Sequence, residues 1–503
     1  MELPESVRVR NINASAVRGS AGYVLYWMTA ARRTTFNFGL DRAVAWAEAL
    51  QRPLIVLEAL RTDYPWASDR LHRFVLDGMR DQMTSFAQTP AHYFPYVEGQ
   101  LGAGKGLLAA LSDKACVVVT DDYPAFFHPR MLQAAARQVA VRLEAVDSNG
   151  LIPLRAARRA YPAAVHFRRH VQTQLRLSLR ECPSAQPFAG RAVPVASEPP
   201  RDILARWPTA SREMLEGSAD VLRSLPIDHA VRPVGLPGGA RAADDVLRRF
   251  IAQRLDSYHT RHNHPDDDGT SRLSPYLHFG HISTHAVFDS VMRRERWTVD
   301  RVGAPSGARE GWWGVSGGAD AFLDQLIVWR ELAFNTCVWK PEDYDRFESL
   351  PAWALDTLER HSRDPRPFLY SARDFEEGAT HDSLWNAAQH QLREEGWMHN
   401  YLRMLWGKKI LEWSATPQEA LKTMSSVMNR WALDGRDPNS WAGYFWTLGR
   451  YDRPWPERAV FGTVRSMSTN STRKKVHVKQ LLGRYGSKRA ENTPAQGRLL
   501  PDS

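Results

Sequence analysis

The chain has few cysteines and no long hydrophobic run, and both shortages restrict what kind of protein it is. Its 503 residues include three cysteines, Cys116, Cys182 and Cys337, which form no CxxC or Cys/His spacing. We therefore expect no zinc or other metal site and no disulfide framework, and a reducing compartment. No run approaches the ~18 apolar residues of a membrane span, and the first residues, MELPESVRVR, lack the apolar stretch of a signal peptide. These absences predict a cytoplasmic protein.

Complete phosphate-binding motifs are also missing. The stretch from Gly99 to Gly106 begins like a P-loop but has Gly106 where Ser or Thr would ligate magnesium. No GxGxxG follows the first predicted strand. We interpret residues 99–106 as a flexible turn between a strand and a helix.

Tryptophan and basic residues, in contrast, are plentiful. Eighteen tryptophans fit either an interior that handles π systems or simply a large core. The net charge is +10, and residues 451–503 hold eleven Lys/Arg against four acids, a difference of +7. Such a block is typical of a nucleic-acid partner but also of a solvated tail.

The length predicts two domains. In residues 21–150 short apolar runs alternate with amphipathic stretches, which predicts an α/β domain with a doubly wound parallel sheet and ligands at the carboxyl ends of its strands. The predicted strands are 23–28, 54–57, 93–98, 116–120 and 141–146, and the predicted helices are 37–50 and 69–86.

The rest of the chain divides by composition. Residues 1–20 are expected to be a flexible N-terminus. Residues 151–200 are expected to be an interdomain linker, with a basic helix at 161–180 and a segment rich in Pro, Ser and Ala after it. Residues 201–485 have helical periodicity, and 486–503 are expected to be a disordered basic tail.

The stretch from Gly396 to Trp413, GWMHNYLRMLWGKKILEW, predicts a helix with one buried face. Trp406 and Trp413 are seven residues apart, which places them on nearly the same side with about 10 Å of rise between them. The spacing alone fits core packing as well as a large apolar ligand.

Around this helix, the stretches WMHNYLRM and MNRWALDGRDPNSW and the aromatic-rich helix after them resemble the flavin-binding helical domain of the photolyase/cryptochrome family. The resemblance is to class II cyclobutane pyrimidine dimer photolyases in particular and runs from about residue 23 to 485. It implies an α/β antenna-type domain joined to an all-α FAD-binding domain. It also implies light-driven repair of pyrimidine dimers in DNA by electron transfer from reduced FAD, by a protein that we expect to be a monomer.

The resemblance implies FAD contacts in three places. Ser274 is expected to cap a helix whose N-terminus holds the flavin pyrophosphate, and Arg403 is expected to pair with Asp434 in the DGRDPN loop, for which a structural Asx-turn is the alternative. The implied cofactor residues are Tyr258, Thr270, Ser271, Leu273, Ser274, Arg330, Arg403, Asp434, Asp437 and Asn439.

The resemblance also assigns electron-transfer and substrate residues. Trp385, Trp406 and Trp413 match the class II tryptophan relay, and Asn429 is expected to face flavin N5. The implied substrate residues are Trp329, Met404, Trp446, Arg453 and Arg465, the two arginines filling the gap in the duplex or holding phosphates.

One position departs from the family pattern. Photolyases that split cyclobutane dimers usually carry Glu where this chain has Gln325, although Asp324 leaves the register open by one residue. Gln can donate a hydrogen bond to the pyrimidine but not a proton. The departure favours a rival interpretation, a cryptochrome-like photoreceptor with weak or no repair. A nucleic-acid-binding protein without a working flavin is a further alternative.

The family also implies an antenna chromophore, a deazaflavin or a folate, or none. Paired His residues of (6-4) enzymes are absent at His399-Asn400, which disfavours that substrate.

Overall fold

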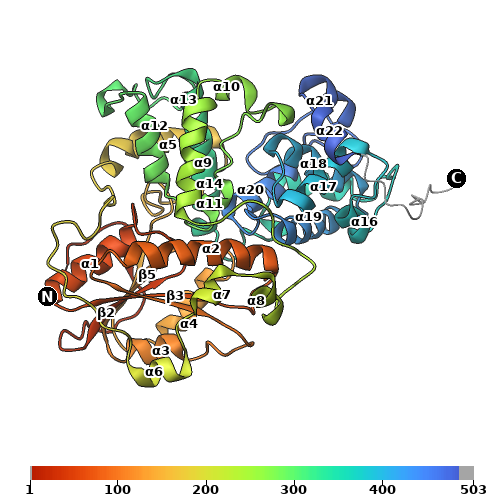
Figure 1. Cartoon of the computed structure of the whole chain (residues 1–503). Helices are drawn as coiled ribbons and strands as arrows, with labels where there is room; N and C mark the ends of the chain where they lie inside the picture. The colour runs from red at the N-terminus through yellow and green to blue at the C-terminus, as the bar shows by residue number, and fades with distance from the viewer. Residues whose placement is uncertain (1–2, 487–503) are drawn as a thin grey trace. The chain divides into compact units, whose positions relative to one another are not determined.

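The computed structural model describes residues 3–486, which form two compact units (Figure 1). The first unit contains the described residues up to Arg158, His170–Ile251 and Arg272–Pro305. The second contains Arg159–Arg169, Ala252–Ser271 and the described residues from Ser306 onward. The predicted linker and helical region therefore contribute to both units. Apart from Gly486, the predicted tail lies outside the described residues.

A six-stranded sheet forms the centre of the first unit, as the α/β prediction required. Its spatial order is β1-β6-β5-β2-β3-β4, and all neighbours are parallel except β1, which runs antiparallel to β6. The strands are β1 (Val9–Asn11), β2 (Tyr23–Met28), β3 (Leu54–Leu60), β4 (His92–Val97), β5 (Ala115–Asp121) and β6 (Leu143–Val146).

Both faces of the sheet are covered, which is why its strands read as continuous hydrophobic runs. Along β2, Tyr23, Leu25 and Trp27 belong to one buried cluster, and Val24 and Tyr26 belong to the other. This alternation follows from the two-residue period of a strand. Helices α1 (Phe38–Leu50) and α2 (Asp69–Phe86) cover one face; α3 (Leu107–Ser112), α4 (His128–Ala136) and α6 (Arg201–Arg206) cover the other (Figure 1).

The N-terminal segment is more ordered than expected. Val9–Asn11 forms the edge strand β1, and Arg8 is 1% exposed. Its guanidinium donates to the carbonyl oxygens of Gly150 and Leu151 and pairs with Asp147 at 3.5 Å. The prediction of a flexible stretch is wrong here because β1 is held by a distant partner, β6, and not by a hydrophobic pattern of its own. Residues 99–106 form bends and turns between β4 and α3, which confirms the expected turn between a strand and a helix.

Helices make up the remainder. The first unit also contains most of α5 (Ala164–Ser178) and α9 (Ala240–Gln253), and α7 (Arg212–Glu216), α8 (Ala219–Ser224), α11 (Ser274–His278), α12 (Thr284–Arg294) and η2 (Val299–Arg301). The described part of the second unit is helical apart from loops, with α10 (Tyr258–Arg261), η1 (Pro265–Asp267), α13 (Gly317–Leu323), η3 (Asp324–Trp329), α14 (Arg330–Trp339), η4 (Phe347–Ser349), α15 (Ala352–Arg360), α16 (Ala372–Glu377), α17 (Ser383–Glu395), α18 (Asn400–Trp413), α19 (Pro417–Trp431), α20 (Pro438–Thr447), α21 (Thr469–Lys475) and α22 (Lys479–Tyr485).

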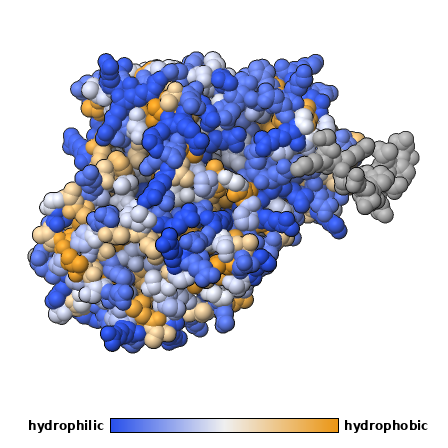
Figure 2. Space-filling view, in the orientation of Figure 1, coloured by the Kyte–Doolittle hydropathy of each residue, from blue (hydrophilic) through white to orange (hydrophobic). Residues whose placement is uncertain are grey.

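Hydrophilic residues cover most of the face drawn in Figure 2, and hydrophobic ones lie in small separate groups. Within residues 3–486, every helix is too short or too polar to span a membrane. Cys116 and Cys337 are buried, Cys182 is exposed, and all three are free thiols.

Candidate functional site

Three buried tryptophans of the second unit form a row of ring contacts, called the tryptophan row below. Trp406 and Trp413 lie on α18 and Trp385 on α17, and each is at most 2% exposed. The Trp385 ring centroid is 6.3 Å from that of Trp406, at an interplanar angle of 5°, and 6.1 Å from that of Trp413, at 64°. Both separations are contact distances for aromatic pairs. The order is therefore Trp406, Trp385, Trp413, so the residue on the preceding helix connects the two on α18.

The tryptophan row ends toward solvent at Trp413. The Trp413 ring contacts Tyr370, at a centroid distance of 5.7 Å, and His381, at 4.9 Å. Tyr370 is half-buried and His381 is exposed. At the inner end, Trp406 Nε1 donates to Gln389 Oε1 at 2.9 Å. A chain of aromatic contacts thus joins the core of α18 to the surface.

The loop between α19 and α20 is held in a strained conformation by one arginine. Arg436 has a φ of 66°, and its guanidinium donates to the carbonyl oxygens of Asn429, Ala432 and Leu433 at the end of α19. A Cβ on Gly435 would lie 2.9 Å from the Asn429 Cα, so the loop needs glycine there. A left-handed non-glycine residue costs about 1–3 kcal/mol and persists where its surroundings impose it.

This loop fixes the amide of Asn429. The side chain is fully buried, and its Oδ1 accepts hydrogen bonds from the Arg436 backbone N–H at 2.8 Å and from the Tyr444 hydroxyl at 3.0 Å. The two donors define which amide atom is the oxygen. Nδ2 is buried and has no hydrogen-bond partner in the described part of the chain. An unmet buried donor costs about 1–3 kcal/mol, so this N–H is available to an acceptor on a ligand.

The expected ion pair between Arg403 and Asp434 is present. Arg403 Nη2 lies 2.8 and 2.9 Å from the two carboxylate oxygens, and its Nε donates to Met398 O. The Asp434 side chain is 7% exposed. Asp437 and Asn439 form the N-cap of α20, because the Asp437 carboxylate accepts from the Asn439 backbone N–H at 2.8 Å and from its Nδ2 at 2.9 Å. The alternative of a structural turn therefore applies to these last two side chains.

The segment with the ambiguous register, η3, is a π-helix. π-Helical turns are rare and are frequent at functional sites. Asp324 is 2% exposed, and Arg168 binds its carboxylate through two N–H groups at 2.8 and 3.3 Å. Gln325 and Trp329 are the two residues of η3 that are not buried. Gln325, and not Asp324, therefore presents its side chain on the accessible side with Trp329. Arg330 follows, 8% exposed, with its guanidinium over the Phe334 ring.

The proposed substrate residues after α20 meet in one cluster. Arg465 forms a two-point pair with Asp452, at 2.8 and 3.1 Å. Its guanidinium lies 4.1 Å from the Trp455 ring centroid and 5.8 Å from that of Trp446. Arg453 is exposed and lies 5.3 Å from the Trp455 ring. The charge of Arg465 is thus fixed in place, whereas that of Arg453 is at the surface.

A buried lysine approaches the same cluster from α18. Lys408 is 0% exposed, and its Nζ donates to Thr447 O at 2.6 Å and lies 4.8 Å from the Trp446 ring centroid. Burial lowers the pKa of Lys408 to about 7, although Asp452 acts in the opposite direction. Met404, one turn before it on α18, is half-buried.

The residues expected to hold the pyrophosphate are divided between the units. Tyr258, 7% exposed, Thr270 and Ser271 belong to the second, and Leu273 and Ser274 to the first. Thr270 Oγ1 is buried and has no hydrogen-bond partner among residues 3–486. The predicted N-cap at Ser274 is wrong, because α11 already starts at Ser274 and Leu273 holds the cap position without a side-chain hydrogen bond. Leu273 has helical dihedral angles, φ −86° and ψ −12°, so the turn is entered one residue earlier.

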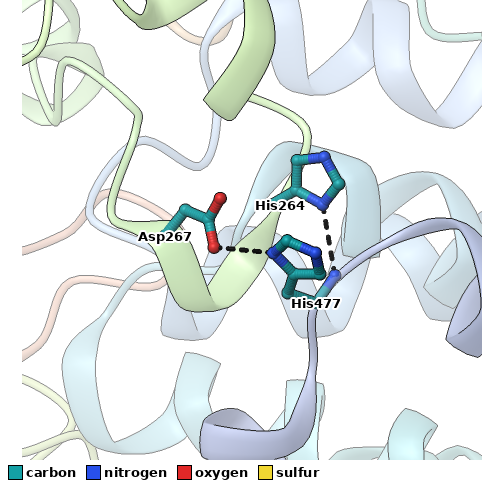
Figure 3. A group of neighbouring side chains, drawn as sticks. All are labelled: His264, Asp267 and His477. Atoms are coloured by element: carbon teal, nitrogen blue, oxygen red, sulfur yellow. Dashed lines mark hydrogen bonds and ion pairs between the residues drawn. The ribbon is translucent and has the colours of Figure 1, made fainter.

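Among the described residues, one group has the composition of a metal site, His264, Asp267 and His477 (Figure 3). Its atoms already bind one another: His264 Nδ1 accepts the His477 backbone N–H at 3.2 Å, and His477 Nδ1 lies 2.9 Å from Asp267 Oδ1. The neighbouring Asp266 carboxylate accepts the backbone N–H groups of Gln480 and Leu481. The group therefore fastens the start of α22 to η1, and a metal ion would have to displace these bonds.

In the first unit, the carboxyl ends of β2 and β5 are closed by the protein itself. Asp121 Oδ2 accepts three backbone N–H groups, from residues 29–31, at 2.7 to 2.9 Å, and Oδ1 accepts the Tyr26 hydroxyl at 2.7 Å. A Cβ on Gly280 would lie 1.8 Å from Ala30 O, so the chain passes directly over this edge.

A second part of that edge is aromatic and partly exposed. Trp66 and Phe126 both have positive φ, 66° and 60°, and their rings stack with centroids 6.0 Å apart. Tyr64 and Phe127 extend the group, with ring centroids 5.9 Å apart. All four side chains are half-buried, which gives an aromatic surface beside β3 and β5.

Curated proteins similar in sequence decide the family. The chain is 31% identical over 479 residues to the deoxyribodipyrimidine photo-lyase of Methanothermobacter thermautotrophicus, covering 95% of this chain and 97% of that one. Relatives of the same name are 32% identical in Potorous tridactylus, covering 90% and 79%, and 30% identical in Oryza sativa subsp. japonica, covering 97% and 93%. The chain belongs to the photolyase/cryptochrome family. No family model matches it. The structure of a bacterial class III photolyase from Agrobacterium tumefaciens has a TM-score of 0.63 at 15% identity, covering 94% of this chain and 87% of that one, which supports the photolyase fold.

Within this photolyase fold, sequence reasoning missed two residues of the second unit, Lys408 and Arg436. Lys408 follows Tyr401 by seven residues and Leu405 by three, which places it on the apolar face of the helix, a position where a charged residue is unusual. That signal was readable. The role of Arg436 depends on a left-handed backbone that its sequence neighbours do not specify.

Proposed function

We propose that this photolyase-family protein repairs cyclobutane pyrimidine dimers in DNA by light-driven electron transfer from reduced FAD, as a class II-like deoxyribodipyrimidine photolyase. The observation that carries the proposal is the tryptophan row. Its stacked Trp385 and Trp406 rings and the contact of Trp385 with Trp413 give a path from the core of the second unit to its surface. Indole can lose an electron and regain it, so the three residues can pass an electron inward one by one.

The polar groups that the second unit leaves open fit FAD. Asn429 Nδ2 and Thr270 Oγ1 are buried and lack a partner in the described part of the chain, and each can hydrogen-bond to a cofactor. Arg403 would keep Asp434 ionised and oriented beside the cofactor. When bound, FAD would supply the light absorption and the electron that open the cyclobutane ring.

The substrate side would be formed by Gln325, Trp329, Met404 and Trp446, which are partly exposed. Aromatic and thioether surfaces suit a dimer that has left the duplex by base flipping. Gln325 would donate an N–H to a pyrimidine carbonyl and transfer no proton. The electron would return once both carbon–carbon bonds had broken, so the reaction would consume no net oxidant or reductant.

A second candidate function is a cryptochrome-like photoreceptor with weak or no repair. The observation that favours it is Gln325, which occupies the accessible position of η3 while the carboxylate of Asp324 is bound by Arg168. The same fold and tryptophan row would then produce a signal to a partner.

An antenna chromophore, a deazaflavin or a folate, would bind the aromatic surface of Tyr64, Trp66, Phe126 and Phe127. Two large residues held at positive φ support this position, because strained backbone clusters at binding sites. Purified wild-type protein should then carry a second absorbing species besides flavin, and Trp66→Ala should lose it while retaining flavin.

The deciding experiment is repair of an oligonucleotide with one thymine dimer, followed by the return of thymine absorbance after photoreduction, with a dark control. Light-dependent repair by wild type supports the photolyase. If only Gln325→Glu repairs, the photoreceptor is the function. If flavin is reduced and neither protein repairs, the substrate assignment is wrong.

A further inference from the structure

Lys408 is a buried amine that forms no ion pair with any of the residues 3–486. Its hydrogen-bond acceptor in the described structure is a neutral carbonyl, Thr447 O, and its other cation-binding contact is the Trp446 ring. Asp452, the acid that favours its charged form, is already bound at two points by Arg465. Burial of an unpaired ammonium is costly, and strongly shifted groups of this kind concentrate at functional sites.

The charges that face Lys408 come from one direction. Asp452 favours the ammonium form and Arg465 opposes it, and both lie in the segment that follows α20. The neighbouring helices come close at the preceding residue, where a Cβ on Gly407 would lie 3.1 Å from Met424 Sδ on α19 and 2.5 Å from Thr447 Oγ1 on α20. Gly407 thus lets α18 approach both helices closely at the residue before Lys408.

Trp446 connects this amine to the substrate side. The ring has Lys408 Nζ at 4.8 Å and the Arg465 guanidinium at 5.8 Å, and it is half-exposed. A cation over an indole is worth about 0.5–2 kcal/mol and more where water is excluded. The protonation state of Lys408 therefore changes both how firmly the ring is held and the local potential felt by a ligand against it.

We propose that Lys408 is a positioning residue that takes up a proton when DNA carrying a pyrimidine dimer binds against Trp446. The proposal rests on the function proposed above. The negative charge of the dimer's own phosphate, brought near this cluster only when the dimer lies against Trp446, stabilises the ammonium, and the ammonium in turn holds the Trp446 ring and offsets that charge. By linkage, binding and protonation strengthen each other to the same extent.

The geometry agrees with the acid–base chemistry. With a pKa of about 7, the amine is mostly neutral in the free protein above neutral pH. Proton uptake on binding then approaches one proton at about pH 8 and vanishes at about pH 6, where the group is already charged. Affinity for the dimer should fall by up to roughly tenfold per pH unit above pH 7, in addition to any change caused by other groups.

Isothermal titration calorimetry tests this. An oligonucleotide with one thymine dimer is titrated into the flavin-loaded protein at about pH 8 and about pH 6, in two buffers with different ionisation enthalpies. Lys408→Met removes the amine, Lys408→Gln keeps a donor for Thr447 O, and Lys422→Met, at an exposed position of α19, is the matched control. We expect wild type and Lys422→Met to take up more protons at pH 8 than both Lys408 variants, and all four to agree at pH 6.

Equal uptake by wild type and both variants at pH 8 overturns the proposal. The proposal is also overturned if the Lys408 variants lose the uptake but wild type takes up as many protons with undamaged DNA as with dimer-containing DNA. The trigger is then the duplex and not the dimer. Flavin absorbance and thermal unfolding establish that each variant is folded. Repair by wild type is measured in parallel. Without repair the proposed function fails, and this inference fails with it. Repair together with equal proton uptake by wild type and the Lys408 variants rejects the role of Lys408 alone.

Discussion

Asp121 in the first unit and Asn429 in the second are both buried polar side chains beside a loop, and they differ in how fully the protein satisfies them. Asp121 accepts four hydrogen bonds from its own chain. Asn429 accepts two through Oδ1 and leaves the donor Nδ2 without a partner among the described residues. Lys408 resembles Asn429, because it is buried and its hydrogen-bond acceptor is the neutral carbonyl oxygen of Thr447 and not a carboxylate.

The difference separates two uses of a buried polar group. A saturated group such as Asp121 holds the fold together, and a ligand could not reach it without breaking those bonds. A group with unused capacity costs stability in the free protein, and a ligand restores that cost. Substitutions at saturated positions should therefore lower stability, whereas substitutions at open positions should change binding and chemistry and can raise stability by removing that cost.

The largest expected effect is at the saturated carboxylate. Asp121→Ala should lower the free energy of unfolding by about 3–5 kcal/mol, because four buried donors lose their acceptor. Urea unfolding monitored by circular dichroism measures this. Asp113→Ala, at an exposed position of the same unit, should stay within about 0.5 kcal/mol of wild type. A small effect at Asp121 would mean that a saturated buried group does not stabilise the fold as the comparison requires.

Lys408→Met should stabilise the protein in a pH-dependent way. The pKa of Lys408 falls from its ordinary 10.5 to about 7 on folding, so the unfolded chain holds the proton more tightly between these values. The penalty is complete below pH 7 and is lost as the pH rises toward ~10. The variant should thus exceed wild type by about 1–4 kcal/mol at pH 6 and by less at pH 9. A gain that is independent of pH would contradict a charged origin of the penalty.

Trp385→Phe interrupts the tryptophan row while keeping an aromatic ring in the core. Flavin photoreduction should slow roughly tenfold or more, which corresponds to a barrier raised by at least ~1.4 kcal/mol. Repair by chemically reduced enzyme should be unchanged. Trp46→Phe, a fully buried tryptophan of the first unit, is the control and should photoreduce normally. Equal rates in both variants would mean that electrons take another route.

The smallest effect sharpens the comparison within one residue type. Asn429→Asp keeps the two accepting contacts and removes the open donor, so FAD affinity should fall roughly tenfold, by the loss of about one hydrogen bond. Asn386→Asp is the matched change at a saturated amide, whose Nδ2 donates to Thr380 O at 2.7 Å. It should lower the melting temperature and leave flavin affinity unchanged. Fluorescence titration with FAD distinguishes the two.

The sequence was sufficient where the periodic pattern and the structure have the same cause. The buried strand 23–28 and the helix 69–86 coincide with β2 and α2 because both faces of the sheet and one face of the helix are covered locally. The helical second unit and the pairing of Arg403 with Asp434 also followed from sequence. β1 did not, because its three residues are defined by β6, more than a hundred positions away.

The sequence named candidate site residues but did not specify how they are arranged. The resemblance named Trp385, Trp406 and Trp413, but only packing of α17 on α18 places Trp385 between the other two. In η3, Asp324 is buried and Gln325 is partly exposed, a difference that the sequence pattern did not specify because a regular 3.6-residue period does not apply in a π-helical turn. Helix boundaries at Ser274 shifted by one residue for a similar local reason.

The contact of His264 and Asp267 with His477, which fastens the start of α22 to η1, can form only late in synthesis. All six strands are complete once Val146 has been synthesised, so the sheet can assemble early on the ribosome. The second unit is built from three separate stretches, and its helix α17 receives α22, which ends at Tyr485. Synthesis therefore completes the three tryptophans many residues before α22, which packs on α17. A nascent chain that stops before His477 leaves the partners of α22 uncovered.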